Sequence, residues 1–218
     1  MLIRGIFLTV LIASGVSFAQ QKSKAPATTS IVPSSIATVE TSLGTFEMEL
    51  LTNEAPKTVE NFTRLVEKKY FDGTHVHRIS RTEGVIQMGD EKSKDTSKVK
   101  EWGTGGRSAS GREFADELNL NSTVYKQGYR KSVVAMANRG PNTNASQFFI
   151  MLRDMPYKPK NYTIFGRVIK GQSVVDRIGQ LDIVPQLSSD DGRPKVHVQI
   201  RKVTIREQES PADQTKQK

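Results

Sequence analysis

The chain has 218 residues, of which 36% are hydrophobic and 25% are charged, and its formal net charge is +9. These values are typical of a soluble globular protein and exclude a disordered or fibrous one. The absence of cysteine excludes disulfide bonds and thiol chemistry. The positive charge leaves nucleic acid open as a partner. However, the lysines of residues 92–100 have no interleaved aromatic residues, so we expect a solvated basic surface and no nucleic-acid binding.

The first nineteen residues have the layout of a secretory signal peptide. Arg4 precedes an apolar stretch over residues 5–16, and small residues at Ser17 and Ala19 form a cleavage site before Gln20. The apolar run is shorter than the roughly 20 residues that cross a bilayer, so we expect no transmembrane segment, although an uncleaved anchor stays open. The interpretation is export, to a periplasm or out of the cell.

The rest of the chain divides by composition. Residues 20–35 are rich in Ser, Thr, Ala, Lys and Pro without an apolar period, which predicts a flexible linker. Residues 207–218 are polar and predict a disordered tail. Residues 36–206 are left for one domain, and we expect it to be a monomer because no long apolar surface stripe is evident.

Within this domain, short apolar segments alternate in the manner of strands. A hairpin is expected at its start, from residues 37–41 and 45–51, and helical spacing of apolar residues predicts helices over 56–69 and 173–181. Many short strands with two distant helices favour a mainly β fold, namely a closed antiparallel barrel. The remaining predicted strands are residues 75–79, 85–88, 132–137, 147–152, 163–168 and 196–205.

The most specific segment is AMANRGPNTNASQFFI, residues 135–150, a polar Gly/Pro/Asn loop between two strands. Such a loop can be rigid, because Gly, Pro and Asn each favour defined turn conformations. It would place the amides of Asn138 and Gln147 beside Phe149. The residues therefore predict a groove that holds an extended peptide by its backbone and buries one apolar side chain.

This segment closely resembles the signature of the cyclophilins, the peptidyl-prolyl cis-trans isomerases, and in particular bacterial exported members. The resemblance covers nearly all of residues 36–206 and implies an eight-stranded closed barrel capped by two α-helices. A phosphate-binding loop is an alternative for the glycines near Trp102, but no Lys-Ser/Thr pair follows them. Further matching motifs are YFDGTHVHRI (70–79), VIQMGD (85–90), WGTGG (102–106) and GREFADE (111–117).

Rotation about an X-Pro bond needs no nucleophile, metal or cofactor. The barrier of about 18–20 kcal/mol arises from delocalisation of the nitrogen lone pair. A site that prefers the twisted amide, in which that lone pair accepts a hydrogen bond, accelerates the rotation. A permanently charged arginine with planar donors suits this role. His75 and His77 would share a strand face, but no acidic cluster completes a metal site there.

The resemblance assigns the catalytic role to Arg78 and implies that proline-containing segments of unfolded or newly exported proteins are the substrates. Gln87 would hold the substrate backbone, and Phe149 would form the floor of the proline pocket. The full set of substrate-binding residues that the resemblance implies is His77, Val85, Gln87, Ala137, Asn138, Gln147, Phe149, Tyr157 and Tyr162.

Several positions depart from the family pattern. Gly84 stands where the family has a phenylalanine, Val85 where it has a methionine, and Lys158 where it has a leucine. Arg139 replaces a small residue, and Tyr157 replaces a tryptophan, which implies weak binding of cyclosporin-type inhibitors. These departures leave open a catalytically weakened peptide-binding or chaperone module on the same fold. A second alternative, which rests on the positive charge of the chain, is a basic nucleic-acid or envelope-binding protein on another fold.

Overall fold

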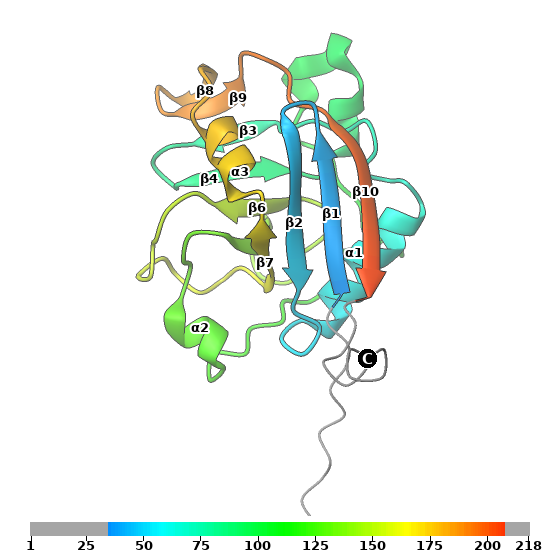
Figure 1. The fold of residues 1–218 in the computed structure, drawn as a ribbon, viewed down its shortest axis with the longest axis vertical. Helices are drawn as coiled ribbons and strands as arrows, with labels where there is room; N and C mark the ends of the chain where they lie inside the picture. Colours follow the sequence, from blue (N-terminus) through cyan, green and yellow to red (C-terminus); the bar gives the residue numbers. More distant parts are fainter. Residues whose placement is uncertain (1–34, 208–218) are drawn as a thin grey trace, which may run out of the picture. The chain divides into compact units, whose positions relative to one another are not determined.

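The computed structural model describes residues 35–207. The predicted signal peptide, the linker up to residue 34 and the tail from residue 208 lie outside the described residues. All strand pairs are antiparallel, and the order in the sheet is β10-β1-β2-β7-β5-β6-β4-β3-β9-β8 (Figure 1). The strands are β1 (Ser35–Thr41), β2 (Gly44–Leu50), β3 (Arg78–Ser80), β4 (Val85–Met88), β5 (Val133–Met136), β6 (Phe148–Met151), β7 (Ile164–Lys170), β8 (Ile183–Ser188), β9 (Asp191–Pro194) and β10 (Ile200–Glu207).

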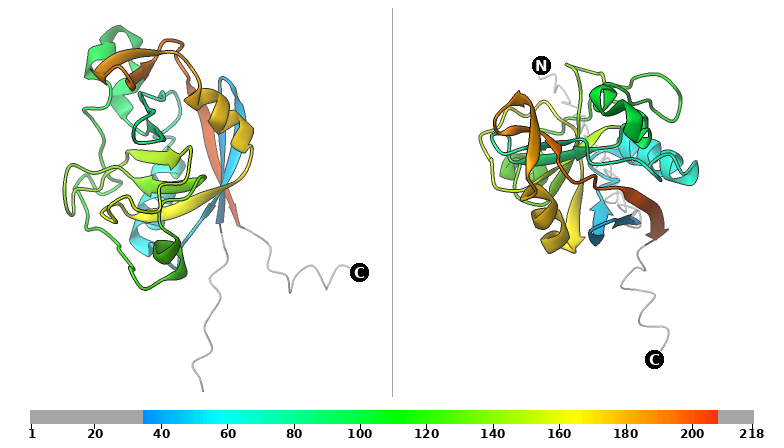
Figure 2. Two further views of the ribbon diagram at one scale, coloured as in Figure 1. Left: turned by 90° about the vertical axis from the view of Figure 1, so that its left-hand side faces the viewer. Right: turned by 90° about the horizontal axis from the view of Figure 1, so that it is seen from above.

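The mainly β fold is confirmed, but the closed eight-stranded barrel is not. The sheet has ten strands and two ends, at β10 and β8. The chain before β3 and the chain before β10 are joined by a bridge between His75 and Gln199 and by backbone hydrogen bonds such as Val76 N to Val198 O, 2.9 Å. Strands β1, β2 and β10 lie side by side (Figures 1 and 2).

The two extra strands form the β8–β9 hairpin, which the sequence did not predict. Its residues are mainly polar and include Pro185, Gly192 and Pro194, all of which have low strand propensity. Strand β9 pairs with β3, and β8 lies outside it as an edge strand (Figure 1). Proline is tolerated on an edge strand because no ladder partner needs its missing N–H.

Both predicted helices are present. Helix α1 (Pro56–Glu67) has proline in its first turn and buries Val59, Phe62 and Leu65. It ends two residues earlier than predicted, since Lys69 already has a positive φ of 51°. Helix α3 (Gln172–Gly179) contributes Val174, Val175 and Ile178 to the same hydrophobic core. Helices that were not predicted are α2 (Thr123–Gln127) and the 3-10 turns η1 (Glu91–Lys94) and η2 (Thr96–Glu101).

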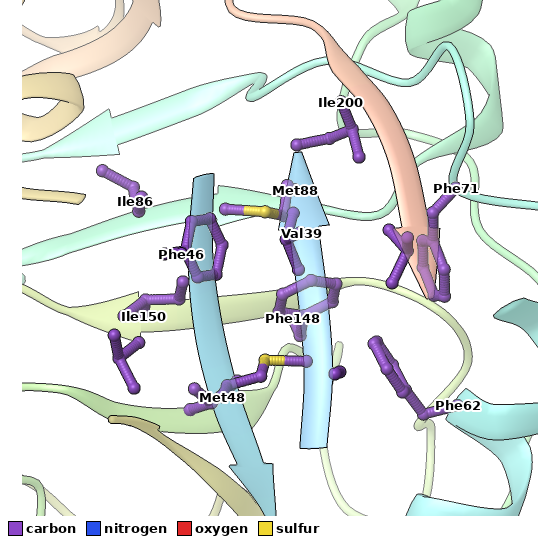
Figure 3. Close-up of a cluster of buried hydrophobic side chains, with 14 of the residues drawn as sticks. Val39, Phe46, Met48, Phe62, Phe71, Ile86, Met88, Phe148, Ile150 and Ile200 are labelled. Carbon is purple, nitrogen blue, oxygen red and sulfur yellow. The ribbon is translucent and has the colours of Figure 1, made fainter. Parts of the chain in front are cut away.

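The central strands bury both faces, and this arrangement positions the site. On β6, Phe148 and Ile150 join the large core, which is shown in Figure 3, whereas Phe149 and Met151 join a second, smaller cluster. The period of two along a strand produces this division. Val85 of β4 belongs to the second cluster as well. One face of the sheet therefore holds the fold together, and the other supplies the floor of a surface cavity.

Candidate active site

Arg78 is the first residue of β3 and lies opposite Gln87 of β4 in the antiparallel register. This register lets the Arg78 Nη1 donate a hydrogen bond to the Gln87 Oε1 over 3.1 Å. The Arg78 side chain is 26% exposed, so the guanidinium lies at the protein surface without extending freely into solvent. The sheet ladder thus holds the predicted catalytic group and the predicted glutamine next to each other.

A chain of amide hydrogen bonds continues from Gln87. Its Nε2 donates to the Gln147 Oε1 over 2.8 Å, and the Gln147 Nε2 donates to the carbonyls of Gly103 and Gly105 over 3.0 and 2.8 Å. Both N–H donors of Gln147 are therefore used inside the protein, and contact with a substrate carbonyl would require one of these bonds to break. Gln87 keeps one N–H donor for a ligand.

A cavity of about 380 Å³ opens beside this network. Phe149 and Val85 form its apolar surface, and the Phe149 ring meets the Tyr162 ring edge-on, with centroids 5.3 Å apart. The cavity is large enough for a proline ring and its neighbour. The residues that line it are Arg78, Glu83, Val85, Gln87, Ala137, Asn138, Phe149, Lys158, Tyr162 and Leu187.

A second cavity of about 360 Å³ adjoins the first and shares its rim of Gln87, Ala137 and Asn138. Gln147 and the glycine loop of residues 103–106 line its other side. The Asn138 Nδ2 donates to the backbone carbonyl of Asn161 over 2.9 Å, which fixes this part of the rim. Two cavities with a common polar rim form a groove, as an extended peptide requires.

Two of the predicted residues lie elsewhere. His77 is only 3% exposed and lines neither cavity; Gly103 packs over its ring, since a Cβ there would be 3.1 Å from the His77 Cδ2. Burial lowers the pKa of His77 to about 4, so the ring is neutral at physiological pH. Tyr157 is 97% exposed and lines neither cavity. Neither side chain therefore lines the two cavities, and contact of either residue with a substrate stays a prediction.

The departures from the family pattern have structural partners that sequence reasoning missed. Gly84 has a φ of +64°, and a Cβ there would lie 2.8 Å from the Arg153 Cγ, so arginine occupies this space. Lys158 forms an ion pair with Glu83, which matches its charge within the cavity. A lysine that is paired in this way repels basic substrates less than an unpaired one would. Arg139 is likewise paired, with Glu113.

The largest omission from the sequence analysis is Asp191 of β9. Its carboxylate accepts two hydrogen bonds from Arg78, Nε to Oδ1 over 2.8 Å and Nη2 to Oδ2 over 2.5 Å. Burial raises the pKa of Asp191, but the hydrogen bonds and charge of Arg78 outweigh this, and the net pKa is lowered. No local pattern marks this residue, because 113 positions separate the two partners.

Residues 35–207 contain neither a metal-ligand cluster nor a membrane-spanning helix. No cluster of three or more His, Cys, Asp or Glu side chains in this range is arranged to hold a metal ion. No helix in the same range combines the length and apolar character needed to cross a membrane. The site offers instead one arginine, several amides and an apolar floor.

These features define a class of protein: a mainly β fold with a surface groove lined by an arginine, amides and an apolar floor. Comparison with known proteins agrees, since a match to the family "Cyclophilin type peptidyl-prolyl cis-trans isomerase/CLD" spans residues 36–205. The chain belongs to this family, and it is a peptidyl-prolyl cis-trans isomerase.

The relatives compared are eukaryotic proteins. "Peptidyl-prolyl cis-trans isomerase-like 1" of Neurospora crassa is 42% identical over 166 residues, covering 76% of this chain and 91% of the relative. The Homo sapiens protein of the same name is 37% identical over 155 residues, covering 71% and 82%. A solved cyclophilin type isomerase of Cryptosporidium parvum has a TM-score of 0.65 and 29% identity, covering 81% of this chain and 99% of that one. These matches support the family and give no support to a closer resemblance to bacterial exported members.

Proposed function

We propose that this isomerase rotates X-Pro bonds in exported, still unfolded proteins, and that Arg78 stabilises the twisted amide. The observation that carries the proposal is the position of the Arg78 guanidinium at the wall of the cavity whose floor is Phe149. A proline ring on that floor would bring its imide nitrogen towards the arginine.

The hydrogen-bond inventory of Arg78 supports this mechanism. A guanidinium has five N–H donors, and three are used here, two by Asp191 and one by Gln87. The remaining two can meet a nitrogen lone pair. That lone pair accepts a hydrogen bond only when the amide is twisted, so the interaction favours the transition state over either planar isomer. Every ~1.4 kcal/mol of this preference gives a tenfold rate increase.

Substrate binding would use the rest of the groove. The free Nε2–H of Gln87 and the rim at Asn138 can hold the peptide backbone, while Phe149 and Val85 take the proline ring. Apolar burial there contributes about 25 cal/mol per Å² removed from water. A related Cryptosporidium parvum structure was determined in the presence of the dipeptide Ala-Pro, with a TM-score of 0.64. A proline-containing segment is therefore the ligand class that we assign to this chain.

The proposal of export rests on the sequence. Residues 1–19 have the features of a signal peptide, and a chain without cysteine needs no disulfide chemistry outside the cytoplasm. Cell fractionation with N-terminal sequencing tests it: a mature chain that begins at Gln20 in the exported fraction is expected. Retention of the full-length chain in the cytosol would contradict it. Monomeric state and weak cyclosporin binding stay predictions.

The mechanism is tested by refolding of a protein whose slow phase is limited by proline isomerisation. Catalytic amounts of the wild type should accelerate this phase, and Arg78→Ala should remove most of the acceleration. Arg64→Ala is a matched control, because this exposed arginine of α1 pairs with the neighbouring Glu60 and lines neither cavity. Equal refolding rates in the presence of the wild type and of Arg78→Ala would contradict the arginine mechanism.

A second candidate is a peptide-binding module with weakened catalysis. Gly84 and Lys158 favour it, because they stand where the family pattern has a phenylalanine and a leucine. In that case the wild type would suppress aggregation at stoichiometric amounts, and Arg78→Ala would do so equally well.

A further inference from the structure

We infer that the β8–β9 hairpin is part of the isomerase site: Asp191 positions the Arg78 guanidinium, and Leu187 forms an apolar wall that selects uncharged, apolar residues beside the proline. This inference rests on the proposed function and adds two residues and a substrate class to it.

The hairpin is held rigidly against the strand that carries Arg78. Strand β9 pairs with β3 through Ser80 opposite Asp191, and the Arg81 N–H donates to the Asp190 carbonyl over 2.8 Å. Gly192 lies so close to β8 that a Cβ would be 2.1 Å from the Val184 carbonyl oxygen. This close approach requires glycine. Asp191 is therefore placed by the backbone and not by a flexible loop.

Asp191 fixes the plane of the guanidinium. Its two oxygens bind the Nε and Nη2 edge of Arg78, and Gln87 binds Nη1 on another side. A bidentate arginine–carboxylate pair is stronger and more directional than a single bond. The Asp191 side chain is only 9% exposed, so competition from water is small. Arg78 is thus ordered before the substrate arrives, which reduces the entropy lost at the reaction step.

Leu187 is an exposed apolar side chain with a place in this site. It is 76% exposed and lines the cavity together with Val85 and Phe149. The other large hydrophobic side chains that are exposed within residues 35–207 do not line it; they are Leu120, Tyr157, Ile169 and Val196. Leu187 lies one residue before Ser188, which pairs with Asp191, so the same end of the hairpin supplies both residues.

The charges around the cavity favour a neutral substrate. Arg78 pairs with Asp191 and Lys158 pairs with Glu83, so two cations face two carboxylates although the whole chain carries +9. A charged residue beside the proline would find no unmatched partner, whereas an apolar one would cover Leu187. Leucine, phenylalanine or similar side chains are therefore the preferred neighbours.

The role of Asp191 is tested with Asp191→Asn, Asp191→Glu and the control Asp182→Asn. Asp182 is paired with Lys195 at the open end of the same hairpin and lies outside both cavities. Asp191→Asn should lower kcat about tenfold or more with KM within about twofold, because positioning acts on the reaction step. Asp191→Glu should restore part of the loss, and Asp182→Asn should match the wild type.

A double-mutant cycle separates positioning from general stability. In the Arg78→Ala background, Asp191→Asn should change kcat by less than about twofold, since it acts through the missing arginine. Thermal unfolding of each variant identifies any loss that comes from misfolding. Asp191→Asn activity equal to the wild type, or an equal loss with and without Arg78, would overturn the positioning role.

The role of Leu187 is tested on proline peptides with Phe, Glu or Lys beside the proline. Wild type should favour Phe, and Leu187→Ala should raise KM for that peptide about three- to tenfold, as expected for a lost apolar contact. Leu120→Ala, at an exposed leucine outside the groove, should have no effect. An unchanged preference overturns this role alone, whereas a wild type without any isomerase activity overturns the proposed function itself.

Discussion

Phe148 and Phe149 are neighbours on β6, yet they belong to two different hydrophobic clusters. Phe148 packs edge-on against Phe62 of α1, with ring centroids 5.7 Å apart, and lies in the main core (Figure 3). Phe149 faces the opposite side and lines the cavity beside Arg78. The alternation of a β-strand thus places one of two adjacent residues in the core and the other at the cavity.

Truncation of these two residues should separate the two functions. Phe148→Ala should lower the free energy of unfolding by about 3–5 kcal/mol, because it opens a cavity in the core. The molecules that stay folded should keep their KM. Phe149→Ala should raise KM for a proline peptide about tenfold through loss of the apolar floor. Urea unfolding and peptide kinetics measure the two effects, and a KM effect of Phe148→Ala equal to that of Phe149→Ala would contradict the division.

The buried His77 predicts a pH dependence of stability. Burial lowers its pKa to about 4, whereas an unfolded histidine titrates near 6.5. Between these pH values the unfolded state binds more protons, so the free energy of unfolding rises with pH across this window. The gain is on the order of 3 kcal/mol. Unfolding of wild type and His77→Gln at pH 4 to 7 measures it; parallel curves would show that His77 does not contribute.

Removal of the charge on Glu83 should change substrate preference. Lys158 has a side chain only 10% exposed, and Glu83 is its ion-pair partner in the cavity. Glu83→Gln leaves an unmatched cation, so peptides with Glu beside the proline should gain affinity and those with Lys should lose it, each by a few-fold. The double variant Glu83→Gln with Lys158→Met is the control, since it is neutral again. A Glu83→Gln enzyme with the wild-type preference would show that this ion pair is irrelevant to binding.

Gln147 should act mainly through its neighbours. Its amide holds Gln87 and the carbonyls of Gly103 and Gly105. Gln147→Ala frees all three groups, and kcat/KM should fall about tenfold because the groove loses its order. NMR of the glycine-loop amides should show increased mobility in the same variant. Lost activity with an unchanged loop would instead indicate direct contact between Gln147 and the substrate.

The stability that the Arg78–Asp191 ion pair contributes should be lost only at acid pH. The pKa of Asp191 is lowered, so its carboxylate stays ionised at and above the ordinary aspartate value of about 3.9. As pH falls through the lower, folded-state pKa, the pair is lost and so is the stability it contributes. The difference in stability between wild type and Asp191→Asn should therefore be constant near neutrality and shrink only below about pH 4. A difference that shrinks already at pH 6 would contradict the lowered pKa.

Elements with strong local signals were predicted correctly. The apolar stripe and Pro56 of α1, the β1–β2 hairpin around Gly44, and strand β6 are all recognisable from short-range patterns. The loop before Gln147 likewise predicted that Asn138, Gln147 and Phe149 lie close together, and these residues line two adjoining cavities. Local propensity and periodicity were sufficient because these segments satisfy them without tertiary help.

Other elements depended on contacts between distant parts of the chain. The five-residue helix α2 begins at a capping serine, Ser122, but its sequence has no long apolar period. The β8–β9 hairpin consists of residues with low strand propensity and forms because β3 offers a free edge. The placement of His77 beneath a glycine loop and of Tyr157 in solvent is also a tertiary result.

The sequence by itself determined the family and the mainly β architecture, because these follow from local pattern and from motifs that occupy short runs of residues. Only the tertiary structure decided which charges meet. Glu83 reaches Lys158 across 75 positions, and Asp191 reaches Arg78 across 113. Ion pairs depend on distances of a few ångströms in space, and no spacing along the chain specifies them.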